Sequence, residues 1–172
     1  MSLSMSSASL PVFRQSLGHL RHIVQKGIND AQARSYAPQV LMQARLAPDM
    51  LPFSRQVTVA CDVVKIWGHR MQGLEPPKYP NDETTLEQLQ DRIDQTLAWL
   101  ATIPADVLDG TEEQSITMPA SNGQTQTMYS EDYLKHWAIP NLFFHITTAY
   151  AILRHNGVPL GKRDFLYGPD TP

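Results

Sequence analysis

Apolar residues recur every three or four positions over four long stretches of the chain, and this spacing constrains the fold more than any other feature. The pattern predicts helices over residues 6–33, 52–72, 84–100 and 130–155, each with an apolar face. The chain has 172 residues, which is the usual size of one domain. We therefore expect a single all-α domain over residues 1–172, folded as an up-and-down four-helix bundle.

Residues with special backbone or capping properties mark the ends of these helices. Pro52 suits the first turn of the second helix, and Gly73 suits its left-handed end. Thr84 and Glu87 have the capping-box spacing at the start of the third helix. Pro140 lies inside the fourth helix and predicts a kink or an irregular turn there.

A short stretch between the third and fourth helices has a different character. Residues 115–118 and 124–128 are rich in β-favouring side chains and flank the pair Asn122 and Gly123, which suits positive backbone angles. We expect a small β-hairpin at this point, inserted between the last two helices of the bundle.

Charge and cysteine content exclude several classes of function. The chain has 14 Lys plus Arg against 17 Asp plus Glu, with no basic block, so we expect no nucleic-acid partner. Cys61 is the single cysteine, which excludes an intramolecular disulfide and suggests a reducing, cytoplasmic compartment. The most apolar run, residues 137–153, is interrupted by polar residues and is too short to span a membrane.

Polar side chains enter a face of the fourth helix that should be covered. Asn141, His145 and Thr148 lie on this face, and buried amide or imidazole groups need hydrogen-bond partners. Two interpretations follow, a satisfied structural network or the wall of a small-molecule or metal pocket. Asp62, in the polar stripe of the second helix, could face His145, although such a stripe is usually solvated. Asp62, Asn141 and His145 are thus candidate metal ligands.

Three residues are candidates for catalytic roles near such a pocket. His145 could act as a base, with Tyr150 or His136 nearby. His136 precedes His145 by nine residues and converges with it only if the irregularity at Pro140 rotates the early part of the helix. The chain has no nucleophile motif, glycine-rich phosphate loop or paired-cysteine site.

Three segments together resemble a known family. They are residues 44–52, residues 75–78 and residues 145–165, the last with the sequence HITTAYAILRHNGVPLGKRDF. They are similar to an uncharacterised bacterial family of unknown function within the DinB/YfiT-like superfamily of metalloenzymes. The resemblance covers nearly the whole chain.

This resemblance implies a four-helix bundle, often dimeric, that holds a divalent metal such as zinc, nickel or manganese. In the better-studied relatives one histidine comes from the second helix and a His-x-x-x-His pair from the last long helix. His145 matches the second histidine of that pair, Asn141 occupies the first position, and the second-helix position falls near Cys61 or Asp62. Some relatives are thiol-dependent S-transferases or catalyse related hydrolytic and isomerase reactions.

Three hypotheses for function therefore stand side by side. The first is a degenerate metal-dependent enzyme of the thiol-transferase kind. The second is a metal-free bundle that binds a small molecule in its cavity. The third is a structural protein that forms a homodimer through the excess apolar surface of its first and fourth helices.

Overall fold

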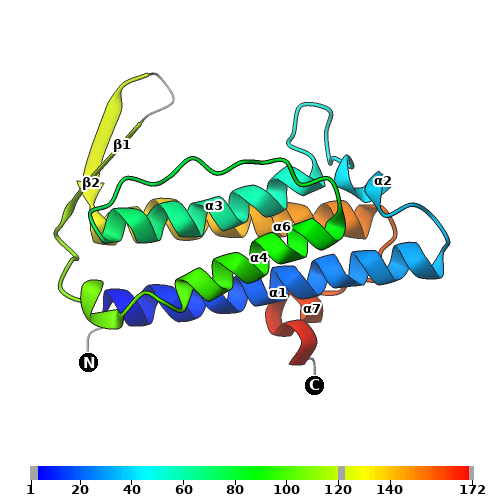
Figure 1. Cartoon of the computed structure of the whole chain (residues 1–172), viewed down its shortest axis with the longest axis horizontal. Helices are drawn as coiled ribbons and strands as arrows, with labels where there is room; N and C mark the ends of the chain where they lie inside the picture. The colour runs from blue at the N-terminus through cyan, green and yellow to red at the C-terminus, as the bar shows by residue number, and fades with distance from the viewer. Residues whose placement is uncertain (1–3, 120–122, 171–172) are drawn as a thin grey trace.

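The computed structural model describes residues 4–119 and 123–170. Four long helices lie side by side (Figure 1) and are α1 (Met5–Ala33), α3 (Phe53–Met71), α4 (Leu86–Leu100) and α6 (Ile139–His155). The shorter elements are α2 (Gln39–Met42), η1 (Ala105–Val107), β1 (Ser115–Pro119), β2 (Thr125–Tyr129), α5 (Ser130–Asp132), η2 (Tyr133–Ala138), α7 (Lys162–Tyr167) and η3 (Gly168–Asp170). The predicted helical bundle with a small hairpin is confirmed.

The direction of one helix departs from simple up-and-down alternation. Asp62 of α3 pairs with Arg92 of α4, and seven residues later in each helix His69 stacks on Trp99. Residue numbers therefore increase in the same direction along both helices, so α3 and α4 run parallel. Residues 72–85, which we call the crossover segment, connect the two helices and run lengthwise along the bundle on the α3 side (Figure 1). The segment is proline-rich and extended, so it is long enough to carry the chain back to the starting end. The other neighbouring pairs, α1 with α4 and α3 with α6, are antiparallel, because contacts later in one helix meet residues earlier in its partner segment.

The predicted apolar stripes form the core. Phe13 of α1 meets Trp67 of α3 edge to face, with 4.7 Å between the ring centroids, and both side chains are fully buried. The apolar faces of α1, α3 and α6 are buried, and on the apolar face of α4 Leu97 is partly exposed. The buried residues of these faces are Leu10, Phe13, Leu17, Leu20, Val24 and Ile28 in α1, Val57, Ala60, Cys61, Val64, Trp67 and Met71 in α3, Leu86, Leu89, Ile93 and Leu100 in α4, and Leu142, Ile146, Ala149 and Leu153 in α6. Burial of these stripes is the main stabilising contribution to the bundle.

In the described part of the chain, no helix is long and apolar enough to cross a membrane.

The start of α4 lies one residue later than the sequence suggests. Thr85, rather than Thr84, caps the helix, and it exchanges hydrogen bonds with Gln88 rather than Glu87. The reason is the side-chain oxygen of Gln88, which accepts from the backbone N–H groups of both Thr84 and Thr85. The expected capping box is therefore present, shifted by one position.

The irregularity expected near Pro140 is a π-helical turn, η2, immediately before α6. Pro140 has no N–H group, and its ring crowds the carbonyl of the residue four positions earlier, so an ordinary α turn is disfavoured. The chain instead widens into the π conformation over residues 133–138. This turn changes which side chains of the segment face the bundle.

The hairpin expected from the sequence is also present. β1 and β2 pair antiparallel, with Ser115 opposite Tyr129 and Pro119 opposite Thr125. Gly123 has the positive φ of +78° that suits its position, while Asn122 lies outside the described residues. Ile116 and Met118 are buried, so this face of β1 packs on the helices.

The close contact between α3 and α4 at Gly68 yields a stability test. A Cβ at Gly68 would lie 2.6 Å from the ring of Trp99 and 2.9 Å from Ile103, whereas one at Gly18 on α1 would meet nothing within 4 Å. We expect Gly68→Ala to lower the free energy of unfolding by about 1 kcal/mol, because overpacking outweighs the gain in helix propensity. Gly18→Ala, the matched control, should raise it by up to about 1 kcal/mol. Urea unfolding measures both, and stabilisation by both variants would contradict the close packing.

Candidate functional site

His145 is held by a hydrogen-bonded chain between α6 and α3. Its Nδ1 lies 2.7 Å from Oε1 of Gln56, and Nε2 of Gln56 donates to the carbonyl of Leu51 at 3.0 Å. Because the amide nitrogen of Gln56 faces that carbonyl, its oxygen faces His145, and Nδ1 of His145 carries the proton. Burial lowers the pKa of His145, which favours the neutral imidazole with its lone pair on Nε2.

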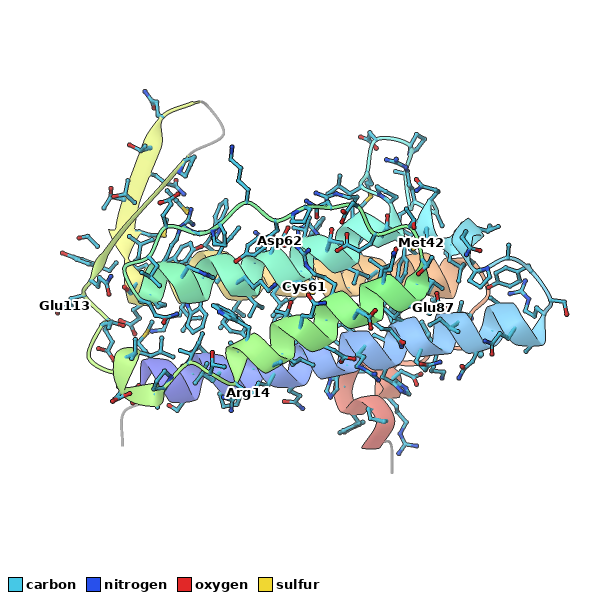
Figure 2. All side chains as sticks on the ribbon, in the orientation of Figure 1. Arg14, Met42, Cys61, Asp62, Glu87 and Glu113 are labelled. Atoms are coloured by element: carbon cyan, nitrogen blue, oxygen red, sulfur yellow. The ribbon has the colours of Figure 1, made fainter. Side chains whose placement is uncertain are left out.

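The sequence suggested that Asp62 could face His145, but Asp62 points to a different helix. Its Oδ1 lies 2.5 Å from Nη2 of Arg92 in α4. Figure 2 shows Asp62 on the side of α3 that faces the crossover segment. Residues 56 and 62 are six positions apart, so they differ by about 120° around the helix. Burial raises the pKa of Asp62, and the guanidinium of Arg92 opposes this shift.

In the described part of the chain, no hydrogen bond or ring contact joins the remaining sequence-predicted residues to His145, although Asn141 lies one turn before it in α6. Asn141 is half-buried and lines a groove that Asp62 also lines. The side chain of His136 is 74% exposed and lies 3.8 Å from Asp132, so the turn at Pro140 does not bring it to His145. Tyr150 packs edge to face on Phe165 of α7, with 6.1 Å between the ring centroids. Two of the five candidates, Asp62 and Asn141, share a cavity.

These positions do not fit the divalent metal that the resemblance implied. Asp62 is paired with Arg92, and an Asn141 amide is a poor ligand for zinc or nickel. Nε2 of His145 is then the only strong ligand atom among the three. Among residues 4–119 and 123–170, no group of three or more His, Cys, Asp or Glu side chains is arranged to hold a metal ion. Cys61 is fully buried between α3 and α4, and burial raises the pKa of its thiol to about 12.

The groove that contains Asp62 and Asn141 has a volume of about 350 Å³ and lies between α3, η2, the start of α6 and β1; we call it the α3–η2 groove. Its polar side chains are Asp62, Arg70, Tyr133 and Asn141. Its walls are otherwise apolar and consist of Val59, Val63, Ile66, Met118, Pro119 and Trp137. A concave surface with apolar walls and a few polar groups is the usual form of a small-molecule site.

Arg70 is the basic residue of this groove. Its Nη1 donates to Oη of Tyr133 at 2.8 Å and lies 3.7 Å from Sδ of Met118. The guanidinium carbon lies 5.4 Å from the centre of the Tyr133 ring. Tyr133 is buried, which raises the pKa of its hydroxyl, while Arg70 opposes this shift. The hydroxyl therefore remains neutral and orients the guanidinium.

Sequence reasoning missed Arg70, Tyr133 and Trp137. Tyr133 and Trp137 both lie in the π turn and both line the groove, with Trp137 42% exposed. The irregularity predicted at Pro140 was the one sequence signal that this segment was unusual. Nothing in the local sequence indicates that the hairpin would close the groove with Met118.

The buried imidazole generates a pH prediction. The pKa of His145 in the folded protein lies below the ordinary value of 6.5, so the unfolded chain takes up a proton first as pH falls. The native state should therefore lose stability below about pH 6.5, and His145→Gln should lose less between pH 7 and pH 5. His136→Gln, at an exposed histidine, should behave as wild type. Denaturant unfolding at a series of pH values measures these free energies. If the free energy of unfolding of His145→Gln fell with pH as steeply as that of the wild type, the burial of this imidazole would be contradicted.

Comparison with known proteins identifies the family. Residues 5–166 match the family described as "Domain of unknown function (DUF1993)". A DinB family member from Shewanella denitrificans, known from its crystal structure, is similar in fold with a TM-score of 0.83 and 35% sequence identity, over 92% of this chain and 89% of that chain. Among curated proteins there is no match. The chain thus belongs to the DUF1993 family and has a DinB-like fold.

Proposed function

We propose that this protein binds a small organic molecule in the α3–η2 groove and that it does so without a metal ion. The observation that carries the proposal is the groove itself, which combines apolar walls with four polar side chains. Its volume of about 350 Å³ lies within the range of small-molecule sites. The π turn beside it supports the same proposal, because such turns occur frequently at functional sites.

The contacts of the candidate ligands favour this function over a metal-dependent transferase. A zinc or nickel site needs several imidazole, thiolate or carboxylate groups that converge on one point. Here the carboxylate of Asp62 neutralises Arg92, and Nδ1 of His145 donates to Gln56. A metal ion would have to break the buried ion pair, which would leave a guanidinium charge without its partner.

The tautomer of His145 favours a second candidate function, an enzyme in which this histidine acts as a base. Gln56 fixes the proton on Nδ1, so Nε2 carries a free lone pair on a neutral ring. His145 lies one helical turn after Asn141, which lines the groove.

The expected homodimer and the cytoplasmic location stay predictions.

Blocking the groove tests the proposed function. We expect mixtures of small aromatic and aliphatic molecules to shift the backbone amide NMR signals of the groove residues in the full chain. Ile66→Trp, at a half-buried wall position, should abolish these shifts by filling the space. Val40→Trp, at a site 61% exposed and outside the groove, is the matched control and should leave them unchanged. Shifts that persist in Ile66→Trp, or that map elsewhere, would reject the groove as the site.

Metal uptake separates this function from that of a metalloenzyme. Protein purified without a histidine tag or chelator should contain no stoichiometric metal, and titration with Zn²⁺ should add none. Asn141→His places a second imidazole one turn before His145, the spacing that zinc-binding helices use, so this variant should bind Zn²⁺ more tightly than wild type. Elemental analysis after dialysis gives the measurement. One equivalent of metal in the wild-type protein would restore the metalloenzyme hypothesis.

A further inference from the structure

We propose that the ligand of the α3–η2 groove is a compact carboxylate with a flat apolar body, whose charged end binds Arg70 and whose body packs against Trp137. This inference rests on the proposed function, because it names the class of molecule that the groove would take. It follows from the charge balance of the groove, the free donors of Arg70 and the shape of the surrounding walls.

The groove carries an uncompensated positive charge. Asp62 is its carboxylate, and it forms an ion pair with Arg92 at 2.5 Å. Arg92 also pairs with Glu83, and Lys65 lies close enough to interact electrostatically with both carboxylates, so Asp62 is balanced by this cluster. Arg70 is its guanidinium, and within the described chain it forms no ion pair, since its contacts are with the hydroxyl of Tyr133 and the sulfur of Met118. An anion in the groove would therefore meet a half-buried cation that has no ion-pair partner among the described residues, beside walls that are mostly apolar.

The free N–H groups of Arg70 are arranged to bind a planar anion. Both of its contacts use Nη1, so within the described residues the N–H groups of Nε and Nη2 have no acceptor. These two nitrogens form one edge of the guanidinium fork, which matches the two oxygens of a carboxylate. The contacts at Nη1 fix the plane of the group in advance, which lowers the entropic cost of binding.

The position of Arg70 favours a carboxylate over a phosphate. Helix N-termini are favourable phosphate sites, because several backbone N–H groups and a partial positive charge converge there. Arg70 lies one residue before the last residue of α3, so the nearby helix end carries the partial negative charge. A single guanidinium at such a place is better matched to one negative charge than to two.

The walls of the groove define the rest of the ligand. The exposed indole of Trp137 offers a flat apolar surface, and Ile66 and Met118 line the same space. Flat rings pack well on an indole, and the volume of about 350 Å³ is near the lower end of the range for small-molecule sites. The ligand is therefore compact, of the size of a single ring with a short acidic side chain.

Paired probes that differ in charge test the inference. We would titrate the 15N-labelled full chain with 3-phenylpropanoate, with its uncharged amide, and with phenyl phosphate. The carboxylate should bind about tenfold or more tightly than the amide, since hydrogen bonds to charged groups are stronger. Arg70→Gln should remove this preference, and Arg70→Lys should keep part of it. Arg14→Gln, at an exposed arginine on α1 away from α3 (Figure 2), should leave it unchanged.

Arg70→Lys and the melting temperatures of all variants separate loss of binding from loss of folding. Equal affinity for the acid and the amide, with or without Arg70, would overturn the anion inference and leave the groove as a neutral binding site. Tighter binding of phenyl phosphate would overturn the choice of a carboxylate. Failure of all three probes to shift the groove signals, where the mixtures of neutral molecules do shift them, would overturn this inference and not the proposed function.

Discussion

Arg92 places a charged guanidinium inside the bundle, where it joins three parts of the chain. It binds Asp62 of α3, and it also binds the carbonyl of Pro80 and the carboxylate of Glu83 in the crossover segment. A buried charge costs several kcal/mol unless it is paired, so loss of either partner would destabilise the parallel packing of α4 on α3. The ring of Tyr79 adds a cation–π contact at 5.3 Å. The same cluster, with Lys65 beside it, holds the carboxylate of Asp62 in an ion pair, and the charge of the α3–η2 groove depends on it.

The sequence predicted the bundle well because helix formation and core formation use one local signal. Apolar residues at intervals of three or four define both the helix and its buried face, and nearly all of the predicted core positions are buried. The parallel direction of α4 was not predictable in this way, because periodicity carries no information on the path of the crossover segment. The one-residue shift of the cap to Thr85 was also not predictable, since adjacent threonines offer two capping registers and the side chain of Gln88 accepts from the N–H groups of both.

The candidate site was less predictable, because its contacts join residues that are distant in sequence. Spacing within the last helix correctly indicated that His145 and Thr148 face a covered surface. The partner of His145 is Gln56, 89 positions away, and no spacing rule within one helix could identify it. For the same reason, spacing could not identify Arg92 as the partner of Asp62. Periodicity gives the face of each helix, whereas the pairing of faces depends on how the helices pack.

The π turn at Tyr133–Ala138 has an evolutionary consequence. A π turn accommodates one more residue than an α turn, so a single codon inserted into or deleted from an ordinary helix can create or erase it. Each residue rotates an α-helix by about 100°, so such a change would swing the indole of Trp137 away from α3 while the segment after Pro140 kept its packing. Related chains could thus gain or lose this recognition surface in one genetic step, without rebuilding the scaffold that supports it.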